Sequence, residues 1–119
     1  PLRLVGSEMC IRDRVDRNRL QISGNTEDVM GHDDLHERFR SFGWHVIDVK
    51  DGNDIDELHA AFEEAKCVKE KPTVLIANTV KGKGSSIMEN KANWHHKVPT
   101  TEEYETIMKD LKTAEEALS

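Results

Sequence analysis

The chain has 119 residues, of which 34% are charged and 36% hydrophobic, and its formal net charge is −6. This composition is typical of one small globular domain, and the acidic balance excludes a nucleic-acid binder that depends on bulk positive charge. No apolar run approaches the ~20 residues that span a bilayer, so we expect neither a nucleic acid nor a membrane as partner. The two cysteines, Cys10 and Cys67, suggest no disulfide framework, and we predict a cytoplasmic protein.

The first residues of the chain show no usable periodicity. Residues 4–14, LVGSEMCIRDR, match the translation of a transposon-end sequencing adapter residue for residue. We therefore expect residues 1–14 to be an adapter-derived leader, and residues 15–119 to be the native part. The alternative is a natural disordered leader.

The first native elements are predicted from periodicity and capping. Residues 15–24 are expected to be extended and to end at a turn, and residues 25–32 to form a polar loop. A helix at about residues 34–42 follows, with Asp34 at its start and Phe42 on its apolar face.

The remaining elements continue an alternation of strand and helix. Residues 44–49 are predicted as a strand, and Asp54 opens a second capped helix with Ile55 on its apolar face. Residues 73–77 form a continuous β-favouring run, as expected for a strand that is covered on both faces. A final helix begins near Thr100. This order implies parallel strands with right-handed crossovers, so the predicted fold class is α/β.

A Gly-rich basic loop, KGKG at residues 81–84, comes directly after the predicted buried strand. Open α/β sheets bind ligands at the carboxyl ends of their parallel strands. Glycines let the backbone approach a phosphate closely, and lysines supply positive charge. For the Gly-Lys-Gly tripeptide at residues 82–84 taken alone, a solvated lysine loop is the commoner explanation.

Asn18 lies in the segment DRNRLQISG at residues 16–24. An asparagine at a strand end most often forms a turn. Its amide oxygen and a nearby backbone carbonyl could instead provide two ligands for a hard divalent cation.

Several segments together resemble the thiamine-diphosphate-binding domain of transketolases: NRLQI at 18–22, FGW at 42–44, KPT at 71–73, TVKGKG at 79–84 and WHHKVP at 94–99. The resemblance implies a truncated parallel-sheet thiamine-diphosphate-binding fold, of which residues 15–119 are the C-terminal portion. It also implies an N-terminal subunit of the split type, because a single-chain transketolase would continue beyond the last helix.

The same resemblance assigns roles to individual residues. It implies that the Asn18 side chain and the Leu20 carbonyl bind magnesium (or calcium), and that Ile22 packs near the thiazolium ring. It implies that Lys81 and His95 lie near the diphosphate, and that His95 also reaches the sugar substrate as a catalytic residue.

The chain departs from the family pattern at three points. Asn78 stands where the family loop has its first lysine. The Gly-Asp-Gly segment, which in the family completes the metal site about thirty residues before the asparagine, is absent from this sequence. His96 stands where the family has a glycine, and it would be strained if that position needed a positive φ.

The implied activity is transfer of a two-carbon ketol unit between sugar phosphates in the pentose phosphate pathway. The implied partners are a second N-terminal subunit and the C-terminal subunit of the transketolase. The glutamate that activates the cofactor lies on the other half in this family, so we expect this fragment alone to be inactive. The alternatives are a deoxyxylulose-phosphate synthase-like enzyme, a specialised sugar-phosphate transketolase, or a non-catalytic α/β binding domain.

Overall fold

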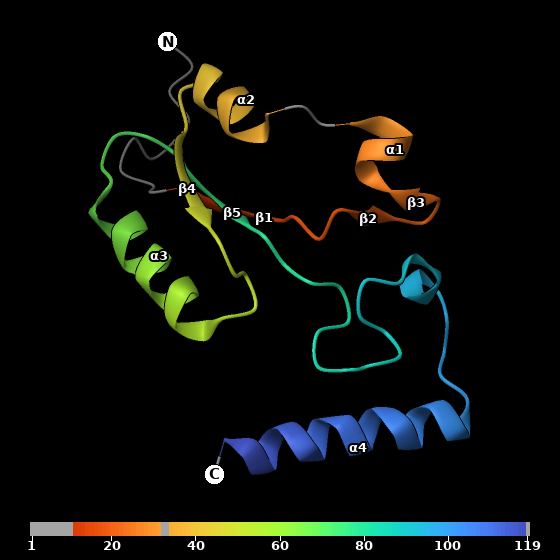
Figure 1. Cartoon of the computed structure of the whole chain (residues 1–119). Helices are drawn as coiled ribbons and strands as arrows, with labels where there is room; N and C mark the ends of the chain where they lie inside the picture. The colour runs from red at the N-terminus through yellow and green to blue at the C-terminus, as the bar shows by residue number, and fades with distance from the viewer. Residues whose placement is uncertain (1–10, 32–33, 119) are drawn as a thin grey trace. The chain divides into compact units, whose positions relative to one another are not determined.

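The computed structural model describes residues 11–31 and 34–118 (Figure 1). Most of the predicted leader, residues 1–10, lies outside the described residues. The chain divides into two compact units, one of Pro1–Arg17 with His32–Thr79 and one of Asn18–Gly31 with Val80–Ser119. In the part that the structure describes, no helix is both long enough and apolar enough to cross a membrane.

The first unit contains a parallel sheet in the order β1, β5, β4, with the bounds Arg12–Asp16, Thr73–Ala77 and His45–Val49. The strands are in step, so that Asp16 and Val49 both lie opposite Ala77, the last residue of the central strand. The prediction of a parallel α/β sheet is therefore confirmed. The carboxyl ends of all three strands meet at one edge, as parallel pairing requires.

The core of the first unit lies between the sheet and α3 (Ile55–Cys67). Its buried members alternate along the strands and recur along the helix: Ile47, Val49, Ala61, Ala65, Leu75 and Ala77. Every residue of β5 is buried, which agrees with its continuous β-favouring sequence. A second helix, α2 (Leu35–Ser41), lies beside β4.

Both predicted helix starts in this unit are confirmed. Asp34 and Asp54 are the N-caps, and each carboxylate accepts hydrogen bonds from two backbone N–H groups of the first turn. The apolar faces were predicted less well, because Phe42 is 84% exposed and Ile55 is 81% exposed. Each stands at a helix end, where periodicity does not determine whether the core extends that far.

The second unit begins with a short antiparallel hairpin, β2 (Leu20–Gln21) and β3 (Gly24–Asn25), followed by α1 (Thr26–Met30). Residues 15–16 and 20–21 are extended and a turn follows at 22–23, as predicted, but the segment is interrupted between β1 and β2. The prediction of a loop over residues 25–32 is wrong, because most of this segment is α1. The chain turns after β1 because Arg19 adopts φ +59°, in the left-handed region.

The rest of the second unit comprises the 3₁₀ helix η1 (Ala92–His95) and α4 (Thr101–Ala117). The predicted start of α4 is confirmed. Thr100 caps it in a reciprocal capping box, in which the Glu103 N–H donates to the Thr100 hydroxyl and the Thr100 N–H donates to the Glu103 carboxylate. No residue of α4 is buried. The helix is attached by the Lys97–Glu103 ion pair at its first turn and by hydrogen bonds from Ser86 to Asp110 farther along.

Candidate functional site

Asn18 lies two residues after the end of β1 and forms a turn through its own side chain. Its Oδ1 accepts a hydrogen bond of 3.0 Å from the Leu20 N–H, and the Thr26 N–H donates to the Arg19 carbonyl at 2.9 Å. The bond from the Leu20 N–H fixes the direction of the Asn18 side-chain amide. An amide oxygen has two lone pairs, so one remains for a cation after the Leu20 bond is made. The turn-forming and metal-binding interpretations of Asn18 are therefore compatible.

Leu20 and Ile22 differ in exposure. Leu20 is half-buried in β2, whereas Ile22, at the hairpin turn, is 62% exposed. An exposed apolar side chain beside a fixed polar turn is suited to covering an aromatic ring of a ligand. That role for Ile22 stays a prediction.

The Gly-rich loop has a compact internal structure. The Asn90 N–H donates to the Lys81 carbonyl at 3.0 Å, and the Gly84 N–H donates to the Glu89 carboxylate at 3.0 Å. Gly82 has φ +72°, and a Cβ at this position would lie 2.7 Å from the Cβ of Met88. The glycine is therefore required by the loop's own packing, independently of any ligand.

The two lysines of the loop are not equivalent. Lys81 is half-buried and Lys83 is exposed.

His95 is the last residue of η1 and is exposed, next to the buried Trp94. The Trp94 indole N–H donates to the Ile87 carbonyl at 2.9 Å, which attaches η1 to the Gly-rich loop. His96, in place of the family glycine, has φ −126° and is therefore not strained. The imidazoles of His95 and His96 meet edge to face, with centroids 4.6 Å apart.

All five predicted site residues belong to the second unit. Within it β2 lies beside η1, so the segment that carries Leu20 and the helix that ends in His95 are neighbours (Figure 1). A single cradle formed by Asn18, Lys81 and His95 stays a prediction. Across residues 11–31 and 34–118, no group of three or more His, Cys, Asp or Glu side chains is arranged to hold a metal. A metal here would therefore rely on Asn18 and on backbone oxygen.

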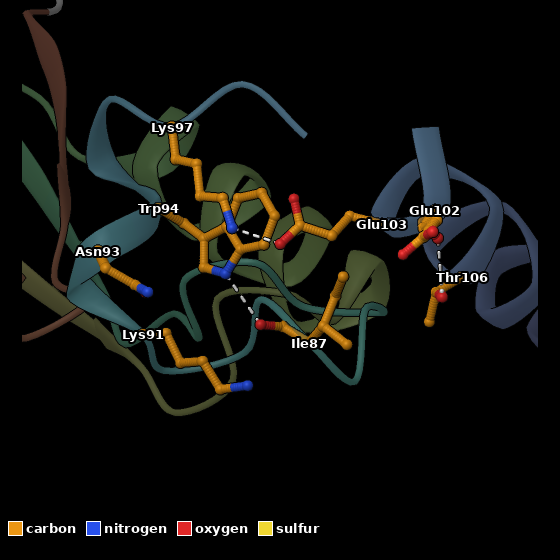
Figure 2. Close-up of a pocket in the computed structure, with 8 residues that line it drawn as sticks. All are labelled: Ile87, Lys91, Asn93, Trp94, Lys97, Glu102, Glu103 and Thr106. Carbon is orange, nitrogen blue, oxygen red and sulfur yellow. Dashed lines mark hydrogen bonds and ion pairs between the residues drawn. The ribbon is translucent and has the colours of Figure 1, made fainter. Parts of the chain in front are cut away.

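The second unit also contains a pocket of about 360 Å³ that the sequence did not predict (Figure 2). Its lining comes from the loop, η1 and α4: Ile87, Lys91, Asn93, Trp94, Lys97, Glu102, Glu103 and Thr106. The Lys97 ammonium lies 4.4 Å from the Trp94 ring centroid and forms an ion pair with Glu103. The pKa of Glu103 is lowered mainly by the hydrogen bond from Lys97 and secondly by the hydrogen bond from the Thr100 N–H.

A polar chain in the first unit was also not predicted. Asp48 Oδ1 lies 2.9 Å from His36 Nε2 and accepts a hydrogen bond of 3.1 Å from the Asn78 amide. Although burial acts against it, hydrogen bonds from His36 and Asn78 lower the pKa of Asp48. Asn78 stands where the family loop has a lysine, so in this chain the position has a structural contact in place of a charge.

The sequence was compared with known protein families. The family described as "Transketolase, thiamine diphosphate binding domain" matches residues 11–115. The chain belongs to the transketolase family. This confirms the resemblance drawn from the motifs, and with it the fold class.

Similar transketolases include separate subunits and longer chains. An apulose-4-phosphate transketolase subunit of Phocaeicola vulgatus is 42% identical over 104 residues, 87% of this chain and 37% of that protein. The 6-deoxy-6-sulfo-D-fructose transketolase subunit SqwG of Clostridium is 37% identical over 97 residues, 82% of this chain and 35% of that protein. A transketolase of Nostoc is 48% identical over 81 residues, 67% of this chain and 12% of that protein. This chain thus spans about a third or less of these relatives.

Solved transketolase structures share the fold. That of Campylobacter jejuni has a TM-score of 0.78 at 24% identity, over 86% of this chain and 16% of the other. That of Pichia stipitis, in complex with sedoheptulose 7-phosphate, has a TM-score of 0.61 at 27% identity, over 89% of this chain and 19% of the other.

Proposed function

We propose that this chain contributes part of the thiamine diphosphate site of a transketolase that transfers a two-carbon ketol unit between sugar phosphates. The observation that carries the proposal is the family match over residues 11–115, which includes every predicted site residue. The grouping of those residues in one unit of the structure supports it.

The proposed metal is magnesium, or calcium, bound by the Asn18 amide oxygen and the Leu20 carbonyl. Both cations prefer oxygen ligands, and the Asn18 amide is already oriented by its bond to the Leu20 N–H. Two protein oxygens are only part of an octahedral set, so diphosphate oxygens, water and other protein groups would supply the rest.

The remaining residues would hold the organic part of the cofactor. Lys81 would neutralise diphosphate oxygens, and Ile22 would cover the thiazolium ring. His95, exposed at the end of η1, would donate a hydrogen bond to the diphosphate and contact the sugar. The chemistry that thiamine diphosphate supplies when bound is carbanion stabilisation during carbon–carbon bond cleavage.

The proposed partners are a second N-terminal subunit and the C-terminal subunit of the transketolase. Two of the relatives are themselves named as transketolase subunits, which supports a split enzyme. The first of these names specifies an unusual sugar phosphate, which favours a specialised sugar phosphate as substrate. Because the resemblance places the glutamate that activates the cofactor on the other half of the enzyme, we expect no turnover by this chain alone.

The proposal can be tested by titrating the isotope-labelled chain with thiamine diphosphate and Mg²⁺ and following amide chemical shifts. We expect shifts at residues 18–22, 81–84 and 94–96, and weaker binding in Lys81→Met. Lys83→Met is the matched control, because it removes an exposed lysine from the same loop. Shifts confined to the region of β4 and α3, or no magnesium dependence, would overturn the assignment.

A further inference from the structure

His95 is exposed, but the residues around it are fixed. On one side, Trp94 is only 8% exposed and its indole N–H is bonded to the Ile87 carbonyl. On the other side, two residues later, the Lys97 ammonium turns back over the same indole ring, 4.4 Å from its centroid. The backbone at His95 is thus held between two side chains that contact each other.

Lys97 also connects this segment to α4 (Figure 2). The Glu103 carboxylate uses both oxygens: Oε1 accepts from Lys97, and Oε2 accepts from the Thr100 N–H at 2.9 Å. The Glu103 N–H in turn donates to the Thr100 hydroxyl at 3.3 Å. The capping box therefore fixes the carboxylate, and the carboxylate fixes the lysine.

We propose that Lys97 and Glu103 are positioning residues that hold His95 in a defined place at the end of η1. The role of His95 in this inference, contact with a diphosphate, rests on the proposed function. The contacts that carry the inference are independent of that role. Without them, the segment between the Trp94 anchor and the start of α4 would have no side-chain attachment among those that the structure describes.

The pocket provides two matched controls. Lys91 and Glu102 line the same cavity as Lys97 and Glu103. Neither side chain forms an ion pair within the described part of the chain. Lys91→Met and Glu102→Gln therefore change charge at the pocket without touching the contacts that hold His95.

The first measurement is ¹⁵N relaxation of the full 119-residue chain. In the unaltered protein we expect an order parameter at the His95 amide of about 0.85, and in Lys97→Met and Glu103→Gln a value below about 0.6. Lys97→Arg keeps the cation and should restore order, and the two control variants should not change it. Dispersed amide signals from α4 would show that each variant is folded.

The second measurement is titration with inorganic pyrophosphate, followed by the imidazole signals of His95. A disordered His95 must be ordered on binding, so Lys97→Met and Glu103→Gln should raise the dissociation constant about three- to tenfold. Lys97→Arg and Glu102→Gln should bind as the unaltered chain does. A contribution of Lys97 to stability alone would lower the unfolding midpoint without changing this constant.

The outcomes separate the two proposals. If the variants keep His95 ordered, the positioning inference is overturned, whatever the chain binds. If the variants lose order but the unaltered chain does not bind pyrophosphate, the positioning inference stands and the proposed diphosphate contact fails. If order is lost and pyrophosphate affinity does not change, the inference that order at His95 serves the ligand is overturned.

Discussion

The side-chain amide of Asn78, just after β5, donates a hydrogen bond of 3.1 Å to the carboxylate of Asp48 on the neighbouring strand β4. The same nitrogen donates to the Val49 carbonyl at 2.9 Å. His36, from α2, contacts the same oxygen of Asp48. Asn78 therefore joins the end of β5 to the neighbouring strand β4. The Asp48 carboxylate that it contacts also holds α2 through His36.

Asn78→Ala should lower the free energy of unfolding by about 1 kcal/mol, mainly through loss of the partly buried bond to the Val49 carbonyl. Asn78→Asp should lower it further, because a second carboxylate would then face Asp48. Urea unfolding followed by circular dichroism measures both changes. An unchanged midpoint in Asn78→Asp would contradict this account of the contact.

Stability should fall in acid through Asp34 and Asp48. Backbone hydrogen bonding at Glu37 is the main cause that lowers the pKa of Asp34, and for Asp48 burial is outweighed by bonds from His36 and Asn78. Both folded-state pKa values lie below the ordinary 3.8. The two carboxylates therefore stabilise the fold fully at a pH above the ordinary pKa of 3.8. This stabilisation is lost as the pH falls through their lowered folded-state pKa values.

Urea unfolding between about pH 2 and about pH 7 would measure this dependence. In a plot of the free energy of unfolding against pH, Asp48→Asn should make the acidic limb less steep, because the substituted side chain no longer titrates. Asp56→Asn, at an exposed position of α3, serves as the matched control for the removal of an acidic side chain. An acidic limb of the same steepness in both variants would exclude Asp48 as its source.

Ser85 and Ser86 should respond in opposite directions to replacement by alanine. Ser85 Oγ is buried without a hydrogen-bond partner among the described residues, so Ser85→Ala should raise the free energy of unfolding by up to about 1 kcal/mol. Ser86 donates from its hydroxyl to Asp110 at 2.7 Å, and Ser86→Ala should lower stability. A loss of stability in both variants would indicate that Ser85 has a partner after all.

Gly82→Ala should lower the free energy of unfolding by at least about 1 to 2 kcal/mol, the cost of a left-handed backbone for an L-residue. The contact with Met88 adds to it. Gly31→Ala is the control, since its φ is −57° and its new Cβ would lie 3.4 Å from the Glu27 carboxylate. We expect a change within about 0.5 kcal/mol there. Thermal unfolding of the two variants side by side would show the difference.

Local features of the fold could be predicted from sequence because their causes lie within a few residues. Asp34, Asp54 and Thr100 cap helices through bonds to N–H groups two or three residues ahead. The strand at 73–77 was evident from its unbroken run of β-favouring residues. The turn at Asn18 was one of two interpretations of that residue, whereas no sequence pattern indicated the left-handed Arg19 that shortens the strand.

The family, the parallel alternation of elements and the residues proposed to hold the cofactor all follow from the order of amino acids alone. The folded chain was needed to learn that Ile55 is exposed, that His96 has an unstrained backbone, and that Lys97 connects Trp94 to Glu103. The difference is one of range, because capping and periodicity act along the chain over one or two turns. Tertiary contacts decide which side chains are buried, which conformation a loop adopts and which ion pairs join two elements. Local sequence does not specify those contacts.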